Sequence, residues 1–172
     1  MRATVILALA SALTLSLGGA LTAQAQQALD VNGAFAGEGL PTGWAPNRPG
    51  YWDDSGTVVL TEVSDLEKNS VRLTSVSRAM SLYTSAWQFA VSAGDKVVVR
   101  CLMRGEGAGS LGVYYYPAGG WLKKEVPVFA DWSEYAAELT IPEKVTDIRV
   151  VIGVPPRAST EFLDLAVEIV KR

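Results

Sequence analysis

Residues 94–107 read GDKVVVRCLMRGEG, and residues 132–142 read WSEYAAELTIP. Each segment is an apolar run that follows a turn signal and ends at Gly or Pro, the pattern of a β-strand bounded by turns. Between them lies Ser110–Tyr116, another strand-like run, whose tyrosines lead into Pro117. Three strand signals at such short spacing predict an all-β domain.

Similar runs separated by turn signals occupy the rest of the chain, and no long window has the 3.6-residue period of an amphipathic helix. Nine or ten strands in one unit predict two sheets packed face to face, a β-sandwich. The further strand candidates are Ala28–Phe35, Thr57–Val63, Ser70–Val76, Ser81–Val91, Trp121–Phe129, Thr146–Val154 and Phe162–Val170.

Side chains alternate along a strand, so odd and even positions predict opposite faces. On the strand at 96–104, the opposite face to the apolar one carries Arg100 and Arg104, which cannot be buried without partners. Tyr114 and Tyr116 share a face of their own strand. The predicted core positions of the strands at 96–104 and 162–170 are Val97, Val99, Cys101, Met103, Leu163, Leu165, Val167 and Ile169.

The first residues have the pattern of a secretory signal peptide. Arg2 precedes the apolar run Val5–Leu17, and Ala23–Ala25 provides a small-x-small cleavage site. The alternative, a transmembrane anchor, is disfavoured because the run is shorter than the roughly 20 residues that span a bilayer. We therefore expect a signal peptide at 1–25, one domain at 26–172, and a secreted or periplasmic protein without a membrane segment after cleavage.

Composition excludes several classes of site. The chain has no His and one Cys, so Ser-His-Asp and Cys-His catalysis and the common tetrahedral zinc sites are excluded. Cys101 can form no internal disulfide and is expected to be a buried thiol. Loss of Arg2 with the signal leaves 14 cationic and 18 acidic side chains, a net charge of −4. This charge predicts no nucleic acid partner.

Four motifs together resemble the galactose-binding-like jelly-roll domains, especially the carbohydrate-binding modules of bacterial glycan-degrading enzymes. Each motif is short, but their order extends the resemblance over residues 26–172. It implies a jelly-roll β-sandwich that binds carbohydrate without transforming it. The motifs are Val31–Phe35 followed by Leu40–Trp44, then Val91–Val97, Trp132–Pro142 and Phe162–Val167.

The resemblance also implies a structural calcium ion between the first and last strands. Family members often place Glu directly after the opening Phe, whereas this chain has Ala36 there and Glu38 two residues later. A calcium site would then use Asp164, Glu38 and backbone carbonyls, since calcium accepts flexible oxygen cages. The alternative is that Asp164 and Asn32 only hydrogen-bond the strand ends, and no cofactor is required.

Sugar sites combine aromatic faces, which stack on pyranose rings, with planar polar groups that meet the hydroxyls. If Ser110–Tyr116 pairs with the strand at 96–104 through the turn at 105–109, the tyrosines and arginines share one face. The alternative is a solvated sheet face, and Trp52 could equally plug one end of the sandwich. The predicted ligand-binding residues are Tyr114, Tyr116, Trp121, Arg100, Arg104, Gln88 and Trp52.

Three functions follow from this sequence. The first is a non-catalytic module that binds an oligo- or polysaccharide. The second is an envelope or extracellular protein-interaction domain that keeps the sandwich without sugar binding. The third is a glycan-degrading enzyme, which is disfavoured because no acid–base pair stands out. Neighbouring Asp53 and Asp54 would face opposite ways on a strand, whereas glycosidase carboxylates face each other across a cleft.

Overall fold

A computed structural model describes residues 25–47, 56–85 and 89–172. The predicted signal peptide up to residue 24, Trp52 and Gln88 lie outside these residues. Within these residues the chain forms fourteen strands and one short 3-10 helix, Ser64–Leu66. No helix among the described residues is long and apolar enough to cross a membrane.

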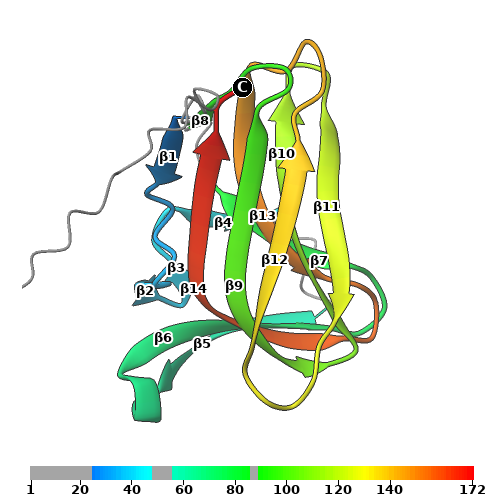
Figure 1. Cartoon of the computed structure of the whole chain (residues 1–172). Coiled ribbons are helices and arrows are strands. Elements are labelled where there is room, and N and C mark those ends of the chain that lie inside the picture. Colours follow the sequence, from blue (N-terminus) through cyan, green and yellow to red (C-terminus); the bar gives the residue numbers. More distant parts are fainter. Residues whose placement is uncertain (1–24, 48–55, 86–88) are drawn as a thin grey trace, which may run out of the picture.

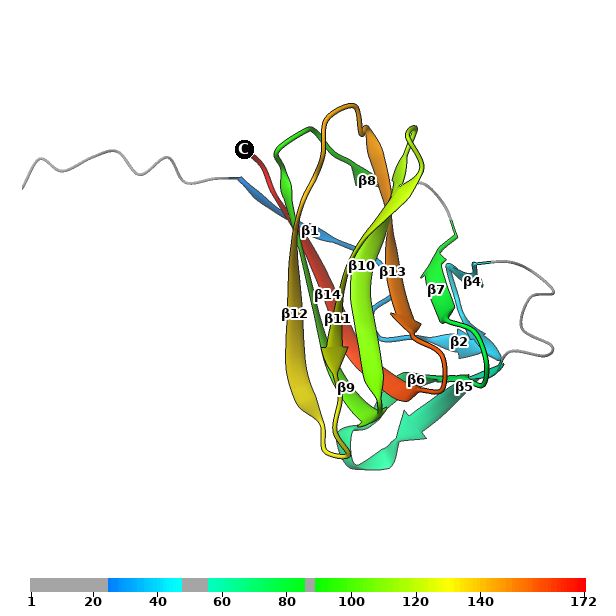
Figure 2. The same ribbon diagram turned by 90° about the vertical axis from the view of Figure 1, so that its right-hand side faces the viewer.

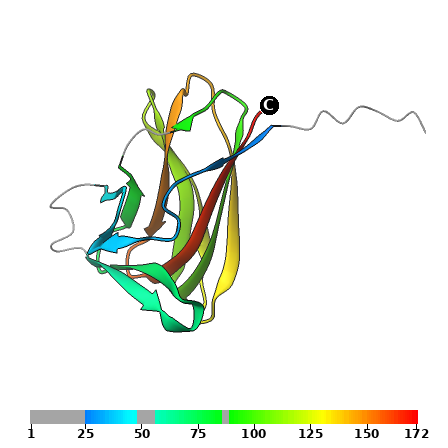
Figure 3. The same cartoon turned by 90° about the vertical axis from the view of Figure 1, so that its left-hand side faces the viewer.

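One sheet contains both the first and the last strand, and we call it the terminal sheet. Its strand order is β12-β9-β14-β6-β5, with β1 paired to β14. In Figure 1, β14 in red lies beside β9 in green, and Figure 3 shows blue β1 running beside β14. The strands are β1 (Gln26–Leu29), β5 (Gly56–Val63), β6 (Lys68–Ser75), β9 (Lys96–Glu106), β12 (Ser133–Thr140) and β14 (Ser159–Val170).

The second sheet carries the tyrosine-rich strand, and we call it the tyrosine sheet. Its order is β11-β10-β13-β7-β4, with the short β8 paired to β13. A separate pair joins β2 (Gly37–Glu38) to β3 (Leu40–Pro41). The strands are β4 (Trp44–Pro46), β7 (Met80–Thr84), β8 (Phe89–Ala90), β10 (Ala108–Tyr116), β11 (Gly120–Pro127) and β13 (Asp147–Val154).

The two sheets form a β-sandwich, which confirms the predicted fold class. Figure 2 shows them as two layers, and every described strand pair is antiparallel. The described residues contain more strands than the nine or ten expected. The excess consists of strands of two to four residues, too short to leave an alternating pattern in the sequence.

The core lies between the sheets, where alternating side chains of both meet. Val97, Val99, Cys101 and Met103 of β9 are all buried, as predicted, against residues such as Ile148 of β13. Burial raises the pKa of the Cys101 thiol above its ordinary value, so the thiol stays protonated and unreactive.

The four core positions predicted for β14, Leu163, Leu165, Val167 and Ile169, are all buried, but the strand also contains a bulge that simple alternation does not predict. Asp164 has a positive φ of 53°, and the pairing of β14 with β9 shifts register between Leu163 and Ala166. This bulge changes which residues face inward, so that Phe162 before it and Leu165 after it both join the core. The backbone N–H of Leu165 donates to the carbonyl of Gly33, which ties the N-terminal segment to the bulge.

The chain passes from one sheet to the other at Gly107. This residue is the only one between β9 and β10, and its φ of 92° suits glycine. β9 pairs with β12 and β14 in the terminal sheet, whereas β10 pairs with β11 and β13 in the tyrosine sheet. The predicted pairing of the two strands through the turn at 105–109 is therefore wrong.

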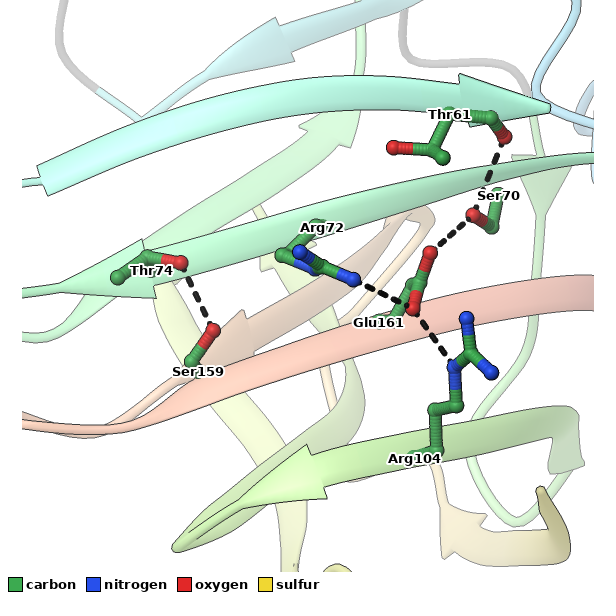
Figure 4. A network of polar contacts seen from close by, with 7 residues as sticks. All are labelled: Thr61, Ser70, Arg72, Thr74, Arg104, Ser159 and Glu161. Carbon is green, nitrogen blue, oxygen red and sulfur yellow. Dashed lines mark hydrogen bonds and ion pairs between the residues drawn. The ribbon is translucent and has the colours of Figure 1, made fainter. Parts of the chain in front are cut away.

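A row of charges crosses the outer face of the terminal sheet, with Glu161 between Arg72 and Arg104 (Figure 4). Arg72 Nη2 and Arg104 Nε donate to Glu161 Oε2 at 3.0 and 2.8 Å, and Ser70 Oγ donates to Oε1 at 2.7 Å. Burial by itself raises the pKa of Glu161, but these three hydrogen bonds outweigh it and hold the pKa below the ordinary 4.5. The buried carboxylate therefore stays ionised and joins three strands.

We predict that Glu161→Gln lowers the free energy of unfolding at neutral pH. The loss should be roughly 1–3 kcal/mol, because charge-assisted hydrogen bonds disappear but both arginines still reach water. The pKa of Glu161 is lower in the folded protein than its ordinary value of 4.5, so the ionised carboxylate stabilises the fold fully at pH values above 4.5. This stabilisation is lost as the pH falls through the pKa of the folded protein.

Urea unfolding at about pH 7 and about pH 3 therefore tests this role, since the gap between wild type and variant should narrow at the lower pH. Glu143→Gln, at an exposed loop position, is the control and should leave stability unchanged at both values. An equal gap for Glu161→Gln at both pH values would contradict an ionised structural carboxylate.

Candidate functional site

A hollow of about 290 Å³ lies on the outer face of the tyrosine sheet. Strand register brings its residues together: Tyr114 of β10 is paired with Trp121 of β11 on one side and with Arg149 of β13 on the other. Tyr83 of β7 and Asn47, just after β4, complete the lining that the described residues provide. Four strands and the residue after β4 thus contribute one polar or aromatic side chain each.

The aromatic side chains of this hollow are held by mutual contact. The rings of Tyr114 and Trp121 meet edge to face, with centroids 4.8 Å apart and planes at 62°. The Arg149 guanidinium carbon lies 5.0 Å from the centroid of the Tyr83 ring, a cation–π contact. Trp121 keeps 40% of its surface exposed, so a large aromatic face is available to a ligand.

A second hollow of about 220 Å³ shares Asn47 and Trp121 with the first. Ser110 and Gly112 of β10 contribute to its lining, and Lys123 of β11 adds a cation. We call the two hollows together the tyrosine-sheet groove. Asn47 and Trp121, near opposite edges of the sheet, line both hollows, so one extended molecule can contact both hollows.

The structure brings together two of the predicted ligand-binding residues, Tyr114 and Trp121. Tyr116 follows Tyr114 by two positions on the same strand and is 51% exposed, but it pairs with Asp147 and does not line either hollow. The predicted aromatic set therefore meets in space at Tyr114 and Trp121, and Tyr116 lies outside the hollows. That these residues bind a ligand stays a prediction.

Arg100 and Arg104 do not share a face with these aromatics, which corrects the predicted cluster. Both lie on the outer face of the terminal sheet, because the crossing at Gly107 sends β9 and β10 into opposite sheets. Arg100 donates to Glu168 at 2.9 Å, and Arg104 donates to Glu161. Their role in ligand binding, like that of Trp52 and Gln88, stays a prediction.

Sequence reasoning missed Asn47, Tyr83 and Arg149. Arg149 left a usable signal, since it is the one cation of β13 and lies between the apolar residues Ile148 and Val150. A cation at an outward position among buried neighbours marks a face that is not core. Asn47 left none, because it follows a three-residue strand in a segment rich in Pro and Gly.

Asn32 and Asp164, near the predicted calcium site, are already engaged with protein groups, whereas the other predicted ligand, Glu38, is exposed on β2. The side-chain amide of Asn32 donates to the carbonyls of Ala36 and Thr42 at 2.9 and 2.7 Å, and Asp164 forms an ion pair with Lys68. The described residues contain no group of three or more Asp, Glu, Cys or His side chains suited to a metal. This arrangement does not fit a calcium cage, because an amide N–H and an ammonium already satisfy these oxygens.

We predict that excess EDTA leaves the melting temperature unchanged. The contacts of Asn32 and Lys68 hold the opening segment and the β14 bulge without a cation. Thermal unfolding followed by circular dichroism, with EDTA and then with added calcium chloride, measures this. A melting temperature that falls in EDTA and recovers with calcium would restore the ion implied by the resemblance.

Comparison with known proteins identifies the fold and not a family. No protein-family model matches the chain, and no curated protein is significantly similar to it in sequence. Among solved structures, the CBM22-1 xylan-binding domain from Paenibacillus barcinonensis Xyn10C has a TM-score of 0.61 and 13% identity. The alignment covers 88% of this chain and 99% of that domain.

Two longer proteins contain a similar domain. The CBM22-1–GH10 modules of Clostridium thermocellum xylanase 10B, complexed with xylohexaose, match 86% of this chain at a TM-score of 0.55 and 15% identity. The enzymatically active domain of bacteriophage CBA120 tailspike protein 4 matches 73% at a TM-score of 0.55 and 12% identity. This chain spans 28% and 19% of those two chains. The chain therefore has the β-sandwich fold seen in carbohydrate-binding modules.

Proposed function

We propose that this protein is exported to the periplasm or the medium and binds a glycan chain in the tyrosine-sheet groove without transforming it. The observation that carries the proposal is the convergence of Tyr114, Trp121 and Arg149 on one hollow. The fold of carbohydrate-binding modules supports it, since similar domains bind saccharides. The export rests on the signal-like first 25 residues.

The chemistry of the groove suits a sugar better than a purely apolar or purely charged ligand. The C–H-rich faces of a pyranose can stack on Trp121, which is exposed, and on Tyr114 beside it. Arg149 and Asn47 supply N–H donors and an amide oxygen that match ring hydroxyls. Sites for small ligands usually combine a small number of polar groups with aromatic side chains.

The size of the groove favours a chain of sugars over a single one. Its two hollows, of about 290 and 220 Å³, share Asn47 and Trp121 and so adjoin each other. A ligand that stacks on Trp121 can therefore extend into both. Xylan and xylo-oligosaccharides are the first ligands to test, because similar solved domains carry these names.

The described lining of the groove contains no carboxylate. Most glycosidases need two carboxyl groups roughly 5–10 Å apart across the bound sugar. The residues that line the described groove thus support binding and provide no acid–base pair. A hydrolase or lyase activity would need other groups.

We predict that Trp121→Ala weakens binding to soluble xylan by about tenfold or more. The reason is that truncating a central aromatic of a binding site costs about 2 kcal/mol, and 1.4 kcal/mol is a factor of ten. Affinity electrophoresis in gels that contain xylan measures retardation, and calorimetry with xylohexaose measures the dissociation constant. Arg149→Met should weaken binding as well, by removing hydroxyl contacts.

Trp132→Phe is the matched control, because Trp132 stacks with Arg104 on the opposite sheet. It should bind neutral glycans such as xylan as the wild type does. A panel of neutral and acidic glycans extends the test if xylan is not bound. The proposal is wrong if the folded protein binds no glycan of the panel, or if Trp121→Ala binds its glycan as tightly as the wild type.

A further inference from the structure

A second cleft, of about 380 Å³, lies on the outer face of the terminal sheet, on the opposite side of the sandwich from the groove. Two arginines from neighbouring strand positions stand at its margins, Arg72 on β6 and Arg104 on β9. The floor is β14 between them, with Ser159 and Glu161, and Ala130 of a neighbouring loop forms part of the wall. We call this the arginine cleft.

Arg104 is fixed in position by two different contacts. Its Nε donates to Glu161, and its guanidinium carbon lies 4.5 Å from the centroid of the Trp132 ring. One edge and one face of the guanidinium are thus engaged, while its side chain remains 35% exposed. A guanidinium has five N–H donors, so the terminal nitrogens keep donors for a further partner.

Arg72 bonds the same carboxylate from its other side (Figure 4). Its Nη2 donates to Glu161 Oε2 at 3.0 Å, and its side chain is 47% exposed. Because both arginines bond the same oxygen, their guanidiniums are held close together. Folding has therefore already ordered these two long side chains, and a ligand need not supply that entropy cost.

The exposed guanidinium donors of the arginine cleft favour an anion. Glu161 is 2% exposed and uses both oxygens within the protein, so it neutralises one of the two arginines and offers no acceptor to a ligand. The exposed Glu106 carboxylate at the rim balances the positive charge that remains, so the guanidinium donors, and not a net charge, would hold an anion here. The Glu106 side chain forms no hydrogen bond or ion pair with the described residues, and its carboxylate can accept a hydrogen bond from a hydroxyl group.

We propose that the arginine cleft is a second ligand site, which binds an oxyanion carried by a hydroxylated molecule such as an acidic sugar. Paired guanidiniums match the planar, multidentate geometry of carboxylate and sulfate groups. Ser159 and Glu106 then face the hydroxyl groups around the anion. The site does not depend on glycan binding in the groove, because the two lie on opposite faces of the sandwich.

Amide NMR titrations locate binding at either face. The probes are trigalacturonate, galactose 6-sulfate and neutral galactose, and the reporter amides are Gly105 and Ser159 for the cleft and Gly112 and Tyr83 for the groove. We expect one or both anions to shift the cleft amides. Comparing the trigalacturonate titration with the galactose 6-sulfate titration then shows whether a carboxylate or a sulfate group binds. Galactose should leave the cleft amides unshifted.

Three variants test the contacts. Arg104→Gln should weaken binding of the anion at the cleft about tenfold, since it removes a charge-assisted contact. Arg100→Gln is the matched control on the same strand and face, where the guanidinium pairs with Glu168, and should change it little. Glu106→Gln, at an exposed position whose side chain forms no hydrogen bond or ion pair with the described residues, should strengthen binding about twofold to fivefold by removing repulsion.

Glu143→Gln makes the same change in net charge far from the cleft and serves as the control for Glu106→Gln. If Arg104→Gln does not fold, the comparison of Glu106→Gln with Glu143→Gln still tests whether the cleft binds the anion. The proposal is overturned if neither anion shifts Gly105 and Ser159, if galactose shifts them equally, or if Arg100→Gln loses as much affinity as Arg104→Gln. Anion shifts only at the cleft support this site even where no glycan binds the groove.

Discussion

Which side chains lie on each outer face of this sandwich depends on where the chain crosses from one sheet to the other. Gly107 separates β9 from β10, and its φ of 92° lies in a region that a side chain would strain. Two residues earlier, a Cβ on Gly105 would lie 2.0 Å from the carbonyl oxygen of Ser159. Glycine at both positions lets β9 end against β14 and lets β10 begin in the other layer.

This crossing gives the sandwich two outer faces of different character. The tyrosine sheet presents Tyr114 and Trp121 in edge-to-face contact, with Arg149 beside them. The terminal sheet presents ion pairs, of which the row through Glu161 is the most buried. An ionised carboxylate can be buried there only because three donors surround it. The same requirement fixes two arginines in place and leaves their outer edges exposed.

The comparisons and the geometry answer different questions about function. Similarity to solved domains at 12–15% identity establishes the β-sandwich, and a fold can carry many functions. The ligand must therefore be argued from the side chains that meet in a hollow. Here the aromatic pair, a cation and an amide on one sheet favour a neutral or acidic glycan, and the arginines on the other favour an oxyanion.

The sequence by itself determined the fold class and most of the core. Alternation along β9 identified four buried residues, because side-chain parity depends only on local strand geometry. The β14 bulge at Asp164 and the strands of two or three residues escaped prediction, since pairing partners far along the chain impose them. Only the tertiary structure decided that Tyr114 meets Arg149 and not Arg104. Which sheet a strand joins is a long-range choice, made by the packing of the whole sandwich.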